Sequence, residues 1–128
     1  MGRRVVLIVG PPGAGKTTLA TTMAEAEDLQ HIEREDYEDD DQYKREAHRL
    51  AHEPDAQLIT IRCCITMEEQ AEWVGRIDPT ETIIVDTPER EAIHRCKMRG
   101  RANWRSEVVA VRRWWAARRA SQWSSGVW

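Results

Sequence analysis

Phenylalanine is absent from the 128 residues, cysteine is scarce, and no long apolar run occurs. The three cysteines, Cys63, Cys64 and Cys96, are odd in number and lack C-x-x-C spacing. This pattern excludes a disulfide framework and a zinc site, and it is typical of reduced thiols in a cytoplasmic protein. No stretch approaches the roughly 18 consecutive apolar residues of a membrane span, so no membrane partner is expected. The apolar run at residues 5–9 is also too short for a signal peptide.

Acidic and basic residues are concentrated in different parts of the chain. The formal net charge is only −3. Residues 25–46 hold eleven acids and three bases, whereas residues 90–119 hold ten lysines and arginines and two acids. Such a split indicates that the basic segment contacts phosphate, although a solvated helix face would give the same pattern.

A glycine-rich loop near the start of the chain carries the strongest functional signal. Residues 10–17 read GPPGAGKT and fit the phosphate-binding pattern G-x-x-x-x-G-K-[ST], between a buried apolar strand and a helical pattern. Lys16 is expected to reach the β- and γ-phosphates of ATP, and Thr17 to bind Mg²⁺. The backbone around them should cradle the phosphates through the helix start. The predicted nucleotide-binding residues are Pro12, Gly13, Ala14, Gly15, Lys16, Thr17 and Thr18.

The remaining pattern predicts a single α/β domain over residues 1–121, followed by a frayed tail at residues 122–128. Short apolar runs predict three further strands, at residues 29–32, 57–63 and 82–85. Helical spacing and end signals predict helices that start near residue 16 and then span about 42–52, 66–77, 89–99 and 106–120. Six tryptophans are present, and we expect Trp114 and Trp115 in the last helix to pack against the sheet.

Carboxylates follow the predicted second strand. In an open parallel sheet this position lies at the carboxyl edge, where ligands bind. Glu35 and Asp36 stand there between Arg34 and Tyr37. A kinase needs a carboxylate that accepts the proton of the attacking hydroxyl, so either Glu35 or Asp36 is a candidate catalytic residue. The four acids at residues 38–41 are more typical of a solvated loop or a helix cap.

Arginines mark the other candidate site residues. Arg62 ends the predicted third strand and is interpreted as a phosphate clamp or as the partner of the nearby carboxylates. Arg34 and Arg62 are the predicted substrate-binding residues. Arg95 and Arg99 lie just before a glycine, and a mobile basic lid there would neutralise charge on the transferred group. Cations at a helix carboxyl terminus are the alternative.

Asp86 ends the fourth predicted strand and superficially matches a Walker B acid. A threonine, a proline and a helical pattern follow it, so we expect Asp86 to serve the turn or cap that helix rather than to hold a metal.

Four segments together resemble the bacteriophage polynucleotide kinases, which belong to the P-loop kinases related to nucleoside monophosphate kinases. They are GPPGAGKTT at residues 10–18, IEREDY at residues 32–37, DTP at residues 86–88 and RCKMRG at residues 95–100. The resemblance implies a three-layer P-loop fold, with a small parallel sheet of order 2-3-1-4 and helices on both faces.

The resemblance also implies a reaction, in which the γ-phosphoryl group of ATP passes to a 5′-hydroxyl of nucleic acid. Glu35 would take the place of the general base, with Arg34 and Asp36 beside it, and Arg95 and Arg99 would belong to the lid. The chain departs from the family in having Glu35 where the family has aspartate. Its third strand also ends in Arg62, where the family tends to have a carboxylate.

We therefore expect an ATP-dependent phosphotransferase, cytoplasmic or in the host cytoplasm if phage-encoded, with ATP and Mg²⁺ as cofactors. A nucleic acid 5′ end is the first expected acceptor. A small nucleoside, nucleotide or metabolite is the alternative acceptor. A rival of another class is a non-catalytic ATP- or DNA-binding module of a phage assembly.

Overall fold

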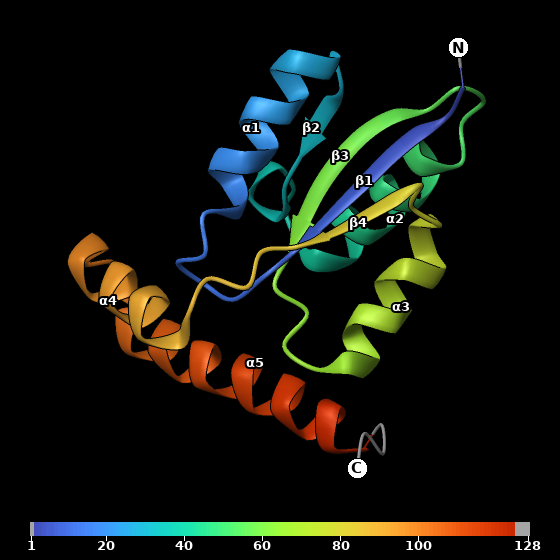
Figure 1. The fold of residues 1–128 in the computed structure, drawn as a ribbon. Helices are drawn as coiled ribbons and strands as arrows, with labels where there is room; N and C mark the ends of the chain where they lie inside the picture. The colour runs from blue at the N-terminus through green and yellow to red at the C-terminus, as the bar shows by residue number, and fades with distance from the viewer. Residues whose placement is uncertain (1, 125–128) are drawn as a thin grey trace.

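The computed structural model describes residues 2–124, with side chains through Ser121. Its centre is one sheet of four parallel strands in the order β2-β3-β1-β4 (Figure 1). The strands span Arg4–Val9 (β1), Gln30–Ile32 (β2), Gln57–Arg62 (β3) and Glu81–Ile84 (β4). The α/β class and the predicted strand order 2-3-1-4 are confirmed.

β1 lies in the middle of the sheet because its apolar run can be buried on both faces. It pairs with β3 on one side and β4 on the other, and residues 5–9 are fully buried. Side chains alternate along a strand. Val5, Leu7 and Val9 accordingly join one core cluster, and Val6 and Ile8 join another.

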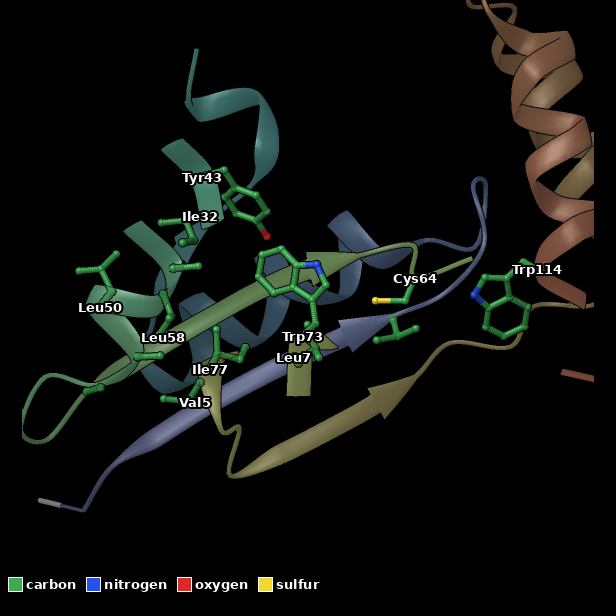
Figure 2. Packing of buried hydrophobic residues seen from close by; sticks show 14 residues of the cluster. Val5, Leu7, Ile32, Tyr43, Leu50, Leu58, Cys64, Trp73, Ile77 and Trp114 are labelled. Atoms are coloured by element: carbon green, nitrogen blue, oxygen red, sulfur yellow. The ribbon is translucent and has the colours of Figure 1, made fainter. Parts of the chain in front are cut away.

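Helices cover both faces of this sheet. α1 (Lys16–Glu27) packs Ala20 against Val6 and Ile8 on one face. α2 (Asp40–Ala51) and α3 (Met67–Ile77) lie on the other face, where Tyr43 and Trp73 pack against the odd-numbered β1 residues (Figure 2). The three layers place the carboxyl ends of all four strands at one edge, where the glycine loop begins.

Two further helices form an antiparallel hairpin beyond that edge (Figure 1). They are α4 (Glu89–Arg99) and α5 (Trp104–Ser124), joined through Gly100 in the left-handed conformation. Their apolar sides share a third cluster made of Ala92, Cys96, Val108 and Val111. The carboxylate of Glu89 at the start of α4 lies 3.2 Å from the guanidinium of Arg119 near the end of α5, which confirms the antiparallel arrangement.

Three predicted helix boundaries are wrong by a few residues. α2 begins at Asp40 instead of residue 42, because the Asp39 side chain accepts a hydrogen bond from the Gln42 amide and caps the helix. α5 begins at Trp104, after a turn closed by the Trp104 amide and the Arg101 carbonyl. It continues to Ser124, three residues into the predicted tail, and residues 125–128 of that tail lie outside the described residues.

Trp114 joins α5 to the sheet, as expected from the sequence. It is 1% exposed, contacts Trp115 edge-on, and donates from its indole nitrogen to the Cys63 carbonyl at 2.9 Å. Figure 2 shows the ring beside Cys64 at the end of β3.

Replacing Trp114 by phenylalanine should lower the free energy of unfolding by about 2 kcal/mol, because the smaller ring leaves a void and a carbonyl without its donor. Urea denaturation checks this. Val109→Ala, at an exposed α5 position, is the control and should change the stability by less than about 0.5 kcal/mol. An unchanged midpoint for Trp114→Phe would show that the indole does not anchor α5.

Candidate active site

The glycine loop connects β1 to α1 at the carboxyl edge of the sheet. Gly13 and Gly15 have φ angles of 77° and 93°, a region that favours glycine. A β-carbon at Gly13 would also lie only 2.6 Å from the Ala92 carbonyl oxygen on α4. α1 has no side-chain cap and no acid in its first turn, so its first amides remain available to an anion.

Lys16 is a buried cation without an acidic partner among the described residues. Its side chain is directed into the loop, where the ammonium donates to the carbonyl oxygens of Gly10 at 2.8 Å and Pro11 at 3.0 Å. The Cys63 thiol lies 3.4 Å away, and the residue is only 9% exposed. A buried charge is costly unless a counter-ion pairs with it. The loop therefore favours an anionic ligand at this place.

Thr17 faces a carboxylate that the sequence did not single out. Its hydroxyl donates to Glu33 Oε1 at 3.2 Å, from the first turn of α1. Glu33 is the first residue after β2, and its other oxygen lies 2.8 Å from His31 Nε2. Despite this short distance, the ring nitrogen has no hydrogen-bond partner in the described part of the chain. Glu33 could have been found from its position at the carboxyl edge, one residue after the second strand.

Glu35 and Asp36 lie in a single 3-10 turn, Arg34–Asp36, and both are exposed. Asp36 accepts a hydrogen bond from the Glu33 amide at 2.8 Å, which closes this turn. Glu35 has no hydrogen bond or ion pair with any described residue. Its carboxylate is thus the freer of the two to accept a proton.

Arg62 leaves the end of β3 and turns toward α2. Its guanidinium lies 2.7 Å from Asp40 Oδ1 and 5.1 Å from the ring centre of Trp73. Of the two predicted roles for Arg62, it is found as the partner of a carboxylate. That carboxylate belongs to Asp40, and no described contact joins Arg62 to Glu35 or Asp36.

The Asp40 carboxylate contacts three cations. Arg34 lies 3.7 Å from the same carboxylate oxygen as Arg62, and Lys44 lies 3.4 Å from the other oxygen. The hydrogen bond from Arg62 lowers the pKa of Asp40 below its ordinary value of 3.8. Lys44 also lies 3.9 Å from Glu72, so two carboxylates, those of Asp40 and Glu72, contact these three cations.

Of the two predicted lid arginines, only Arg95 lies at the loop. It donates to the Gly13 carbonyl oxygen at 3.3 Å and pairs with Glu91 on its own helix at 2.6 Å. Arg99 instead donates to Glu107 of α5 at 2.6 Å. Glu107 is a buried acid, so this ion pair fixes the hairpin.

The turn before α4 also contacts the loop. Thr87 donates to the Ala14 carbonyl oxygen at 2.9 Å, and its own carbonyl accepts from the Trp115 indole at 3.2 Å. Asp86 is exposed, and the amino-terminal cap of α4 is Pro88. The predicted capping role of Asp86 is therefore wrong, and the turn is held by Thr87.

Comparison with solved structures places this arrangement in a known fold. A shikimate kinase from Acinetobacter baumannii, in complex with shikimate, matches over 85% of this chain and 74% of its own, with a TM-score of 0.54. The chain therefore shares its three-layer α/β fold with this kinase. At 16% identity, the similarity shows the fold and no finer relationship. No protein-family model and no curated protein matches the sequence. The closer resemblance to polynucleotide kinases remains a prediction.

None of the described helices has the length and apolarity needed to cross a membrane. The described residues also contain no cluster of three or more histidine, cysteine, aspartate or glutamate side chains that could hold a metal ion.

Cys63 provides a chemical probe of the glycine loop. It is half-buried beside Lys16, whereas Cys64 and Cys96 are fully buried. Iodoacetamide should therefore modify Cys63 first, and the added group should lower ATP affinity about tenfold or more by obstructing the loop. Mass spectrometry and a titration of the modified protein measure both effects, and Mg·ATP should slow the modification. Cys63→Ser is the control, since it should bind ATP and resist the reagent. Full ATP affinity with Cys63 modified would contradict this placement.

Proposed function

We propose that the protein is an ATP-dependent kinase that transfers the γ-phosphoryl group to a hydroxyl. The observation that carries the proposal is the buried ammonium of Lys16, which lies in an uncapped glycine loop without an acidic partner among the described residues. A triphosphate would supply the missing negative charge and accept hydrogen bonds from the first amides of α1. The P-loop kinase fold supports the same conclusion.

Thr17 and Glu33 fit a magnesium ion. Their oxygens are 3.2 Å apart at the start of α1, and hydroxyl and carboxylate oxygens are the ligands that Mg²⁺ prefers. With few protein ligands available, the phosphate oxygens and water would complete the coordination. When bound, the metal supplies charge that neutralises the β- and γ-phosphate oxygens.

The transfer needs a base on the acceptor side. The acceptor oxygen forms a bond to the γ-phosphorus while the bond to the β,γ-bridging oxygen breaks, which leaves ADP. The hydroxyl proton passes to the carboxylate of Glu35 or Asp36. The free carboxylate of Glu35 favours Glu35, because Asp36 already accepts a hydrogen bond from the Glu33 amide.

Arg95 is placed to stabilise the transferred group. Its guanidinium donates to the Gly13 carbonyl oxygen of the loop at 3.3 Å, so it is close enough to the loop to contact a phosphate bound there. Arg99 would need to leave Glu107 to serve the same role, so we assign it to the lid only in a closed state.

We further propose that the acceptor is a 5′-hydroxyl of nucleic acid. The resemblance of the four sequence segments to polynucleotide kinases supports this choice. Arg34, Lys44 and Arg62, which contact the carboxylates of Asp40 and Glu72, also offer three cations with which an anionic acceptor could pair. A small anionic metabolite with a hydroxyl group fits the same three cations and is the alternative.

Transfer of label from γ-³²P ATP tests the proposal. The panel contains a 5′-hydroxyl oligonucleotide, the same oligonucleotide with a 5′-phosphate, nucleosides, nucleotides and shikimate. We expect label on the 5′-hydroxyl oligonucleotide only. Label on a small compound alone would assign the metabolite kinase. ATP binding without transfer to any acceptor would contradict the kinase and favour a non-catalytic module.

A further inference from the structure

A stripe of basic side chains follows the outer face of α4. Arg90, His94, Lys97 and Arg101 are separated by four, three and four residues, and all four are exposed. At 3.6 residues per turn this spacing puts Arg90, His94 and Lys97 on one side of the helix axis, and Arg101 follows after the helix, beyond Gly100. Ala92 is buried on the opposite side, against α5.

The charge of this stripe is not neutralised within the described part of the molecule. Each acid of the hairpin has its shortest ion pair with an arginine outside this stripe. Glu89 pairs with Arg119, Glu91 with Arg95 and Glu107 with Arg99. Arg90, His94 and Lys97 have no ion pair among the described side chains. Arg101 reaches Glu107 only at 3.5 Å and remains largely exposed.

α5 repeats the arrangement on its own outer side. Arg105, Val109 and Arg112 lie four and three residues apart and are exposed, and Arg113 flanks them. None of these three arginines has an ion pair with a described residue. The Arg105 guanidinium lies 4.5 Å from the ring centre of the half-exposed Trp104. An arginine stacked on tryptophan offers a flat surface of the kind on which a base can stack.

We infer that the basic outer sides of α4 and α5, each turned away from the packed centre of the hairpin, bind the phosphodiester backbone of a nucleic acid strand. The inference deepens the proposed function, because it names the surface that would hold the polynucleotide acceptor. Cations without ion pairs among the described residues suit a ligand with regularly spaced anions, and they are Arg90 and Lys97 on α4 and Arg105, Arg112 and Arg113 on α5. Arg95 of α4 contacts the Gly13 carbonyl oxygen of the loop. A nucleic acid strand held on the outer face of α4 would therefore lie one helix diameter, ~10 Å, from the loop.

The same charges do not suit a membrane surface equally well. A helix that binds a bilayer inserts an apolar face between the lipids. The apolar sides of α4 and α5 are instead packed against each other through Cys96 and Val111. Among the hairpin side chains that the structure describes, Met98 and Val109 are the large apolar residues left exposed, and they lie apart from each other.

The test measures binding of the full chain to a fluorescent 20-nucleotide single strand by anisotropy over a range of salt concentrations. Arg90→Glu and Arg112→Glu should each weaken binding about fivefold to tenfold. Each should also reduce the slope of log affinity against log salt by about 0.7. Arg45→Glu is the matched control, since Arg45 is exposed on α2 without an ion pair to a described residue, and it should change the affinity less than about twofold.

Affinity for Mg·ATP, measured on the same variants, checks that they are folded and should not change. The inference would be overturned if Arg90→Glu and Arg112→Glu both kept the wild-type slope of log affinity against log salt. It would also be overturned if Arg45→Glu lost as much oligonucleotide affinity as they do. The wild-type protein could instead bind vesicles of anionic phospholipid and not the oligonucleotide. If Arg90→Glu and Arg112→Glu abolished that vesicle binding, the inference would be overturned in favour of a membrane surface.

The kinase and the surface can fail separately. Oligonucleotide binding that depends on the hairpin, without phosphoryl transfer to any acceptor, would retain the surface and reject the kinase. Transfer to a small acceptor, with oligonucleotide binding unaffected by Arg90→Glu and Arg112→Glu, would retain the kinase and reject the surface.

Discussion

Lys16→Met should weaken ATP binding by at least about 100-fold. The ammonium is expected to contribute charge-assisted hydrogen bonds to the phosphates, worth on the order of 3 kcal/mol together, and methionine keeps the aliphatic part without the charge. In the free protein the ammonium contacts only two carbonyls and a thiol among the described residues. The melting temperature without ATP should therefore fall by no more than a few degrees.

Calorimetric titration with Mg·ATP measures this loss of ATP affinity. Lys97→Met, at an exposed lysine on α4, is the control and should bind ATP within about twofold of the wild type. ATP bound by Lys16→Met with wild-type affinity would refute the assignment of the loop as the phosphate site.

Glu35→Gln should lower the rate of phosphoryl transfer by about 10²–10⁴-fold while ATP affinity stays within about threefold. Loss of a general base raises the barrier by roughly 3–5 kcal/mol. The glutamine amide keeps the size of the side chain, which is exposed and has no described partner. Single-turnover rates with γ-³²P ATP and a saturating acceptor separate this loss from a binding defect.

Asp36→Asn provides the comparison. An asparagine oxygen can still accept the hydrogen bond from the Glu33 amide, so the 3-10 turn should persist and the transfer rate should fall less than in Glu35→Gln. If Asp36→Asn abolishes transfer while Glu35→Gln retains it, Asp36 is the base. If both variants keep the wild-type rate, neither carboxylate takes the proton.

The sheet and the loop could be predicted because they depend on local patterns. The continuous apolar run of β1 requires burial on both faces, and that requirement puts the strand at the centre of the sheet. Gly13 and Gly15 of the loop have positive φ angles that other residues rarely adopt. The strand order followed from the resemblance, since no periodicity in the sequence determines it.

The partners of the charged side chains could not be predicted, because they depend on how separate elements meet. Arg62 pairs with Asp40 because the end of β3 lies beside the first turn of α2. Arg99 pairs with Glu107 because the hairpin turns back at Gly100. Glu33 meets Thr17 because β2 ends beside the start of α1, a proximity that spacing along the chain does not reveal.

A crystal structure with Mg²⁺ and a non-hydrolysable ATP analogue tests the central claim most directly. We predict the β- and γ-phosphates within hydrogen-bond distance of Lys16 and the amides that follow Gly13, with the metal near Thr17 and Glu33. A triphosphate bound elsewhere on the molecule, with Lys16 still donating to the Gly10 and Pro11 carbonyls, would contradict it.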